Sequence, residues 1–380
     1  MKPNYSSRID RLLIETGGCP FITSKAEDIY YFSGFEGDFG FIVLSHPKSF
    51  LLTIKMFEEE TKVVDTNLFN VIVLDRKEIF KKIVDILLEL DGKDIFISST
   101  NTNLYNFIQV IESAKDKKLF GFNKKLLSLR EDHFSVANFR VFFKENLTWS
   151  VRSVKDNYEI SKIKENLTLS DEGFIYLMKK VKPGMREHEV AAELEYYLRY
   201  KGAEGVSFPT IVASGYRSSI PHGRASSKVI QSGEPVVIDF GLRKDMYCTD
   251  TTRTVFFGNP PQEFVDTYKV VLEALNEGIS CIKEGVSASF VDNKVRGVIS
   301  KYNLGDYFVH STGHGVGLEI HEAPMLNSSS NEILKEGMIV TVEPGIYIPG
   351  KFGIRIENMV LVKKDSSEVL TTLGTDLLVL

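Results

Sequence analysis

The sequence predicts two domains: an α/β layer domain over residues 1–145, and a second domain over residues 150–380 in which two helices precede short strands. In the first third, segments typical of strands and of helices alternate, as in α/β layers. A polar segment, Lys144–Lys155, then separates this part from two long amphipathic patterns. After Gly202 the apolar runs shorten and glycine-rich turns separate them. A chain of 380 residues has room for two or three domains.

The N-terminal elements follow from local patterns. Phe39–Leu44 and Ser49–Ile54 are β-rich runs on either side of His46-Pro47, which predicts a hairpin. Three more elements are expected from apolar spacing: a helix over Glu78–Leu90, a strand over Asp94–Ile97 and a helix over Asn103–Ser113. Residues 1–140 do not gather the side chains that perform chemistry, and the isolated His46 and His133 are expected at the surface or in structural roles.

The second domain is predicted to open with two helices. The first covers Asn157–Met178 and is stopped by Lys182-Pro183-Gly184. The second covers Glu187–Lys201 and is followed by Gly202 as a C-terminal stop. The acidic residues, histidines and glycines that could form a site lie in the strands and turns beyond this point.

Composition excludes several classes of protein. With 43% hydrophobic residues the chain can bury a sizeable core, and its net charge of 46 − 51 = −5 argues against non-specific binding to nucleic acid. No stretch reaches the roughly 18 apolar residues of a membrane span, and the charged first twenty residues leave no room for a signal peptide. Three widely separated cysteines suggest neither disulfides nor a thiolate zinc site. We therefore expect a cytoplasmic protein.

Two acids lie in neighbouring β-prone runs. Asp239 stands within the apolar run 236–241, and a buried carboxylate is costly unless it is paired or bound to a metal. Asp250 stands within the next run, 247–254. If the hairpin turns between Lys244 and Asp245, Asp239 and Asp250 lie directly opposite, with side-chain roots about 5 Å apart. Carboxylates that close repel each other unless a cation lies between them.

A similar arrangement recurs near the C-terminus. Glu343 ends one predicted strand and Glu357 lies inside the next, and both are equidistant from Gly350 in the turn. Three histidines also fall within twelve residues, interleaved with glycines that allow close backbone approach: His310, His314 and His321.

This set of side chains suits metal binding. Asp239, Asp250, His314, Glu343 and Glu357 supply four carboxylates and one imidazole, which suits a pair of divalent ions bridged by carboxylates. The alternative is that the acids form separate buried ion pairs or cap turns.

With these flanks and in this order, the five residues resemble the pita-bread metallopeptidases, a family that includes prolidase, aminopeptidase P, methionine aminopeptidase and metal-free creatinase. The resemblance runs from about Lys155 to the end. Residues Ala26–Phe35 are similar, more loosely, to the creatinase/prolidase-type N-terminal domain. The resemblance implies an α/β N-terminal domain and an α+β pita-bread catalytic domain.

The resemblance also implies residue roles. Asp239 would chelate one ion, His314 and Glu343 the other, and Asp250 and Glu357 would bridge both. Four residues are given catalytic or supporting tasks: His222 and His321 would face the substrate, Glu343 would also handle the proton of the attacking water, and Arg355 would support a carboxylate. His310 would support the site without direct contact. The ions would be Mn or Co in the first place, with Zn and Fe also compatible.

The segments 207–215, 221–223 and 317–324 resemble the Xaa-Pro-cleaving branch. The implied activity is that of an Xaa-Pro dipeptidase acting on proline-containing peptides, with aminopeptidase P as the alternative for longer peptides and a non-catalytic peptide-binding module as a remote one. The resemblance further implies a homodimer.

Overall fold

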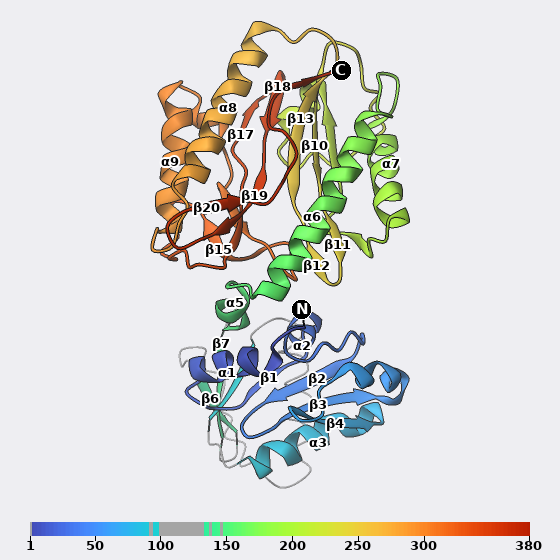
Figure 1. The fold of residues 1–380 in the computed structure, drawn as a ribbon, viewed down its shortest axis with the longest axis vertical. Coiled ribbons are helices and arrows are strands. Elements are labelled where there is room, and N and C mark those ends of the chain that lie inside the picture. Colours follow the sequence, from blue (N-terminus) through green and yellow to red (C-terminus); the bar gives the residue numbers. More distant parts are fainter. Residues whose placement is uncertain (1, 91–93, 99–132, 137–138, 145–146) are drawn as a thin grey trace. The chain divides into compact units, whose positions relative to one another are not determined.

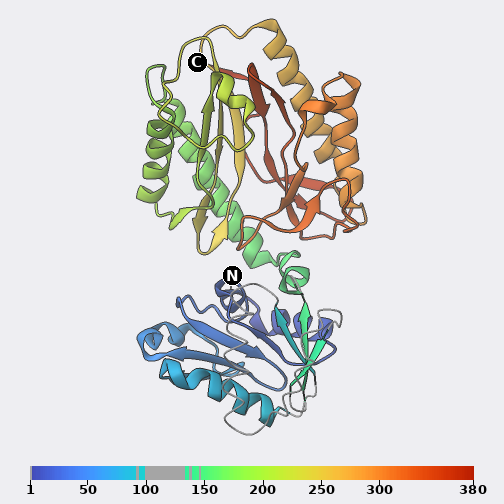
Figure 2. The same ribbon diagram turned by 180° about the vertical axis from the view of Figure 1, so that it is seen from behind.

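The computed structural model describes residues 2–90, 94–98, 133–136, 139–144 and 147–380. The chain divides into two compact units, residues 2–152 and residues 153–380 (Figures 1 and 2). Each unit is described here by itself. Among the helices in these ranges, none has the length and apolar character needed to cross a lipid bilayer.

The N-terminal unit is a mixed seven-stranded sheet with helices, in the strand order β4-β3-β2-β1-β5-β7-β6. Its elements are α1 (Tyr5–Glu15), β1 (Phe21–Thr23), α2 (Ala26–Ser33), β2 (Gly40–Leu44), β3 (Ser49–Ile54), β4 (Phe69–Leu74), α3 (Arg76–Glu89), β5 (Asp94–Ser98), β6 (His133–Val136), β7 (Phe139–Lys144) and α5 (Leu147–Arg152). The α/β fold class is confirmed, as are the β2–β3 hairpin, helix α3 and strand β5. The helix expected over Asn103–Ser113 lies outside the described residues.

The C-terminal unit consists of two halves that each place a pair of helices beside a sheet (Figure 1). The first half, residues 157–256, comprises α6 (Asn157–Met178), α7 (Glu187–Tyr200), β8 (Gly205–Val206), β9 (Ile211–Ser214), β10 (Pro235–Phe240), β11 (Leu242–Lys244), β12 (Tyr247–Cys248) and β13 (Thr251–Phe256). Helix α6 begins where Asp156 and Glu159 form a capping box, and it matches the predicted bounds. Its apolar face and that of α7 pack on β9, β10 and β13.

The second half, residues 262–369, repeats the helix pair and continues into strands. Its elements are α8 (Gln262–Ser280), α9 (Ala288–Lys301), β14 (Gly313–Gly315), β15 (Glu322–Leu326), β16 (Ile339–Val342), β17 (Gly345–Ile348), β18 (Phe352–Arg355), β19 (Asn358–Val362) and β20 (Ser367–Val369). The short strand β21 (Leu378–Val379) returns to the first half and pairs with β13. The strands of both halves lie between α6 and α7 on one side and α8 and α9 on the other (Figures 1 and 2).

The predicted register of the first acidic hairpin is wrong. Strand β10 pairs with β13 so that Asp239 lies opposite Thr252 instead of Asp250. Because side chains alternate along a strand, a displacement of two residues keeps the same face, whereas a displacement of one would reverse it. Asp250 therefore still reaches the pocket that Asp239 lines.

The cause is the position of the turn. Lys244 pairs with Tyr247, so the loop of this hairpin is Asp245-Met246, one residue later than predicted. Both loop residues have positive φ, 50° and 66°. Two-residue hairpin loops favour this conformation, and their usual sequences are Asn-Gly or Asp-Gly. Because the second position here is Met246 and not glycine, the sequence did not indicate the loop.

Gly241 accommodates the close approach of the two arms of this hairpin. A Cβ on Gly241 would lie 1.9 Å from the carbonyl oxygen of Thr249, the residue before Asp250. Only glycine fits where two backbones come this close.

The predicted register of the second acidic hairpin is confirmed. Val342 pairs with Asn358, and Gly345 pairs with Arg355, in one continuous register. Glu343 and Glu357 lie between these two ladders, so continuing the register places them opposite each other. The single strand expected to contain Glu357 is divided into β18 and β19 at this point.

Candidate metal centre

One pocket of about 380 Å³ in the C-terminal unit brings together all nine site residues that the sequence suggested. They are His222, Asp239, Asp250, His310, His314, His321, Glu343, Arg355 and Glu357. They come from both halves and span more than one hundred positions of the chain. A set of side chains this far apart in sequence meets in space only because three sheets bring β10, β14, β16 and β18 together.

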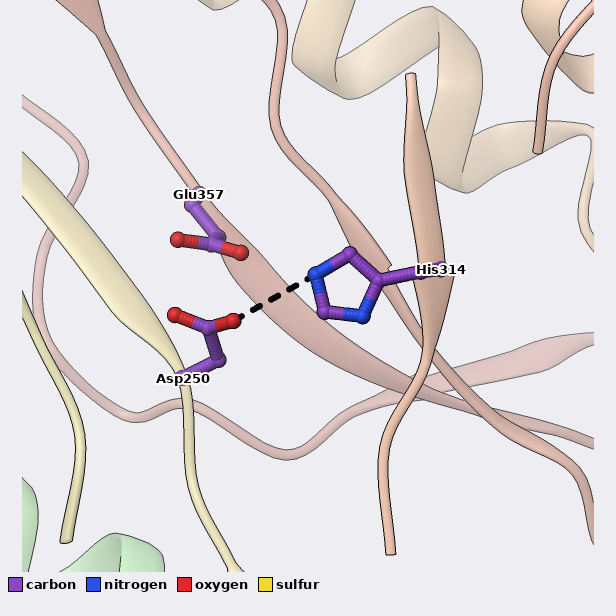
Figure 3. A group of neighbouring side chains, drawn as sticks. All are labelled: Asp250, His314 and Glu357. Carbon is purple, nitrogen blue, oxygen red and sulfur yellow. Dashed lines mark ion pairs between the residues drawn. The ribbon is translucent and has the colours of Figure 1, made fainter. Parts of the chain in front are cut away.

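Three ligand-type side chains converge most closely. One ligand atom each of Asp250, His314 and Glu357 lies within 4.8 Å of the others, and all three side chains are buried (Figure 3). His314 Nε2 lies 3.4 Å from Asp250 Oδ2 and 3.8 Å from Glu343 Oε1. His314 Nδ1 lies 3.1 Å from the carbonyl oxygen of Gly315, which can only accept a hydrogen bond. Nδ1 therefore donates to this carbonyl, and Nε2 is the ring nitrogen that faces the acids.

Glycines on both sides of His314 allow its strand to be packed tightly. A Cβ on Gly313 would lie 2.0 Å from the carbonyl oxygen of Thr341, and one on Gly315 would lie 2.2 Å from that of Ala323. This confirms the expectation that the glycines between the histidines serve close backbone approach. Strand β14, which carries the imidazole, is thereby held between β15 and β16.

Arg355 connects the acids to the wall of the pocket. Its guanidinium is buried and donates to Asp239 Oδ2 at 2.6 Å, to the hydroxyl of Tyr347 at 2.7 Å and to Thr252 Oγ1 at 3.1 Å. It also donates to the carbonyl oxygen of Pro221 at 3.1 Å. Arg355 therefore fixes one carboxylate oxygen of Asp239 and the backbone next to His222.

A second connection fixes His310. Its Nδ1 lies 2.8 Å from the carbonyl oxygen of Ser311 and therefore donates, while Nε2 lies 2.8 Å from the hydroxyl of Tyr347 and accepts. Burial and the nearby Arg355 charge lower the pKa of His310 to about 3, so the ring is neutral. Tyr347 thus links Arg355 to His310, a role that sequence reasoning did not assign.

The metal-free cluster of acids holds its protons strongly. Burial, and then the charges of Asp239 and Glu343, raise the pKa of Asp250 well above its ordinary value. Burial, followed by the charges of Asp250 and Asp239, does the same for Glu357. Burial and the charge of Glu357 raise the pKa of Glu343 to about 8. Carboxylates packed this closely without water or a cation cannot all ionise.

The unsatisfied oxygens in this cluster fit divalent ions. Among the described residues, Asp239 Oδ1 and Glu357 Oε1 are buried side-chain oxygens without a hydrogen-bond donor. Their sister oxygens are already used, Asp239 Oδ2 by Arg355 and Glu357 Oε2 by Thr252 at 2.8 Å. Buried carboxylate oxygens normally have a partner, and a bound divalent cation would supply one here. The donor set of four carboxylates and one imidazole suits hard or borderline divalent metals.

The pocket is also lined by residues that the sequence analysis did not assign to the site individually. These further lining residues are mostly apolar: Phe208, Pro209, Ile211, Pro221, Arg224, Ser311, Ile320 and Met325. Most belong to segments that resemble the Xaa-Pro-cleaving branch, but no pattern within one segment indicates which side chains face the acids. Their proximity depends on strand pairing between distant parts of the chain.

The chain belongs to metallopeptidase family M24, whose family model matches residues 161–364. The model of the creatinase/prolidase N-terminal domain matches residues 7–131. These matches confirm the family resemblance and the two-domain fold class, and they make the protein a hydrolase.

Relatives and solved structures agree with this assignment. The chain is 35% identical to the Xaa-Pro dipeptidase of Pyrococcus horikoshii over 94% of this chain and 93% of the relative. The structure is similar to the Xaa-Pro dipeptidase from Bacillus anthracis, with a TM-score of 0.89 and 32% identity over 99% and 100% of the two chains. It is also similar to the X-Pro aminopeptidase from Thermotoga maritima, with a TM-score of 0.85 and 34% identity over 98% and 100%.

Proposed function

We propose that this protein is a dinuclear-metal Xaa-Pro dipeptidase, which cleaves the bond between an N-terminal residue and proline. The observation that carries the proposal is the convergence of Asp239, Asp250, His314, Glu343 and Glu357 on one pocket in which two buried carboxylate oxygens have no donor. The similarity to several Xaa-Pro dipeptidases supports the choice of substrate.

The five residues would hold the two ions in the division that the family resemblance implies. Asp239 would bind one ion, His314 and Glu343 the other, and Asp250 and Glu357 would bridge them. When bound, divalent ions supply a water of lowered pKa and polarise the scissile carbonyl. Mn or Co is the first choice for this oxygen-rich set, with Zn and Fe compatible.

The remaining polar residues would orient the substrate and move protons. Glu343, placed beside His314, would take the proton of the attacking water and return it to the proline nitrogen. His222 and His321 line the same pocket and would donate to the oxygen that gains charge in the transition state. Arg355 would hold Asp239 in place, and His310 would support the site through Tyr347.

The apolar wall suits the proline side of the substrate. Phe208, Pro209 and Ile211 lie on one strand-and-loop segment, and Ile320 and Met325 come from the other half. The acylated nitrogen of proline has no N–H group and needs no hydrogen-bond acceptor from the protein. An apolar wall can therefore contact the pyrrolidine ring without leaving a donor unpaired.

We further propose that the enzyme works in the cytoplasm as a homodimer. The three cysteines Cys19, Cys248 and Cys281 are free thiols, which agrees with a reducing compartment. The dimer is an expectation from the family resemblance, and the mass of the purified protein in light scattering tests it.

A substrate panel tests the proposed activity. Xaa-Pro dipeptides and Xaa-Pro-Xaa tripeptides are compared with Mn, Co, Zn or Fe added back to metal-free enzyme. A dipeptidase turns over the dipeptides in preference to the tripeptides. Turnover of tripeptides without dipeptides would instead identify an aminopeptidase P, and a protein that purifies without stoichiometric divalent ion and cleaves neither would be a binding module.

A further inference from the structure

Arg224 lies in line with a candidate metal ligand across the sheet of the first half. Its backbone forms an antiparallel bridge with Ile211, Ile211 pairs with Asp239, and Asp239 pairs with Thr252. Directly opposed residues of neighbouring strands place their side chains on the same face of a sheet. Arg224 and Asp239 therefore share a face, with backbones two strand spacings, or about 10 Å, apart.

The backbone of Arg224 is firmly held. Its N–H donates to the carbonyl oxygen of His222 at 2.9 Å, and its own carbonyl accepts from Arg217 Nη2 at 3.0 Å. Arg217 is in turn paired with the fully buried Glu187, which also accepts from the backbone N–H of Ser226 at 3.1 Å. The chain on both sides of Arg224 is thus fixed to α7.

The side chain of Arg224, by contrast, has no hydrogen-bond or ion-pair partner among the residues that the structure describes. It lines the pocket, it is exposed, and within the described ranges no carboxylate or carbonyl accepts from its guanidinium. The other lining cation, Arg355, already donates to Asp239, Tyr347 and Thr252. A rigid backbone that carries an unpaired cation at the mouth of a pocket is preorganised to bind an anion.

The proposed substrate carries an anion that could reach Arg224, namely its C-terminal carboxylate. This assignment rests on the proposed dipeptidase function. In an Xaa-Pro dipeptide the scissile nitrogen is bonded to the proline Cα, and that carbon carries the free carboxylate. When the scissile carbonyl lies at the acids, the carboxylate lies a few ångströms further along the pocket, away from the carboxylates that would repel it. In a longer peptide, a neutral amide occupies this position.

We infer that Arg224 binds the C-terminal carboxylate of the substrate and so selects dipeptides over longer peptides. The guanidinium can offer two parallel N–H groups to a carboxylate, whereas a lysine offers a point charge. Arg224 therefore contributes to binding the C-terminal carboxylate of the substrate, and cleavage of the peptide bond does not require Arg224.

The test compares Arg224→Gln and Arg224→Lys with wild type on three substrates that share the same Xaa-Pro unit: the dipeptide, its C-terminal amide and a tripeptide. For the dipeptide, we expect the glutamine variant to raise KM by about 10- to 100-fold with little change in kcat, the size of a hydrogen-bonded interaction with a charged group. For the amide and the tripeptide, KM should stay within about two-fold of the wild-type value. The lysine variant should recover part of the loss.

Arg199→Gln is the matched control, because it removes another exposed positive charge, on α7 and outside the pocket, and should leave the kinetics with all three substrates unchanged. Inhibition by proline and by prolinamide provides a second readout, in which only the affinity for proline should fall in the Arg224 variants. Thermal melting shows that the variants are folded.

The outcomes separate the two proposals. If wild type cleaves the dipeptide and Arg224→Gln leaves its KM unchanged, or lowers activity on dipeptide and amide alike, the role of Arg224 is overturned while the dipeptidase function stands. If wild type cleaves only the tripeptide, the dipeptidase proposal fails, and the role of Arg224 fails with it.

Discussion

The two halves of the catalytic unit use the same device for different purposes. In the first half, the fully buried Glu187 of α7 accepts from the backbone N–H and the hydroxyl of Ser214 at 2.8 and 2.9 Å. In the second half, the fully buried Asp292 of α9 accepts from the backbone N–H and the hydroxyl of Thr312 at 3.2 and 2.8 Å. In both cases, a helix of the outer layer holds the end of an inner segment through one buried carboxylate.

What each carboxylate holds in place differs. Glu187, together with Arg217, fixes the loop that carries His222 and Arg224, two pocket-lining residues proposed to contact the substrate. Asp292 fixes Thr312, which stands two residues after His310 and two before His314. The first half therefore positions the groups proposed to contact substrate, and the second positions the imidazole proposed to bind metal.

The largest expected effect comes from the acids at which the halves meet. Asp250→Ala removes a proposed bridge contributed by the first half, and Glu357→Ala removes one contributed by the second. Both variants should lose turnover to the background rate, because each change takes a ligand from both ions. Turnover at saturating metal and metal content by elemental analysis are the measurements.

The fold of these variants provides the control. Relief of the repulsion between the acids opposes the loss of the Thr252 hydrogen bond in Glu357→Ala, so both alanine variants should remain folded and melt cooperatively without metal. Near-normal turnover of either variant with metal in excess would show that the residue is not a bridging ligand.

The second-largest effect is expected from the two pocket histidines proposed to contact the substrate. His222 belongs to the first half and His321 to the second, so their variants compare the two halves. Each alanine variant should lower kcat by about 100-fold, the size of a lost donor to developing negative charge. Metal content should remain that of wild type. Loss of metal from His321→Ala would mean that this imidazole is a ligand and not a substrate contact.

Variants of the two buried carboxylates, Glu187 and Asp292, should show that the two halves have different roles. Asp292→Asn should weaken metal binding by about 10- to 100-fold, as expected when a group that orients a ligand is altered. Glu187→Gln should leave metal binding unchanged and raise KM. Each should lower the free energy of unfolding by about 1–3 kcal/mol, because buried donors lose a charged acceptor. Metal titration, steady-state kinetics and denaturant unfolding measure the three quantities, and equal metal affinities of the two variants would contradict the division of roles.

The smallest effect is a pH dependence of the metal-free protein. The pKa of Glu343 rises from 4.5 in the unfolded chain to about 8 in the fold, so between these values the folded state binds more protons than the unfolded state. The free energy of unfolding therefore falls as the pH rises through this window. Each kcal/mol lost should lower the melting temperature by about 2–4 °C. Added divalent metal should reduce this slope, because a cation favours the ionised acids. A metal-free protein whose stability rises from pH 5 to pH 8 would argue against a protonated cluster.

Much of the architecture could be predicted from local pattern. Helix α6 carries its own start signal in Asp156 and Glu159, and its bounds match the prediction. The register of Glu343 and Glu357 follows from Gly350, which stands in the turn with a φ of 72°. In both cases the decisive residues lie within one or two turns of the element that they define.

The rest depends on information that no single segment contains. The bond from Arg355 to Asp239 spans 116 positions, and that from Tyr347 to His310 spans 37. Such partners are chosen by the packing of the two halves. The hairpin at Met246 was predicted one residue too early because a methionine at positive φ contradicts local propensity.

The glycine at position 241 places a lasting restriction on how this sequence can vary. A single added methyl would meet the carbonyl of Thr249 and push against the very next residue, Asp250. Substitutions elsewhere in the hairpin can be absorbed by neighbouring side chains, but rigid backbone cannot yield in the same way. Over evolutionary time, a descendant that still depends on Asp250 can substitute many of the neighbouring residues but must keep glycine at position 241.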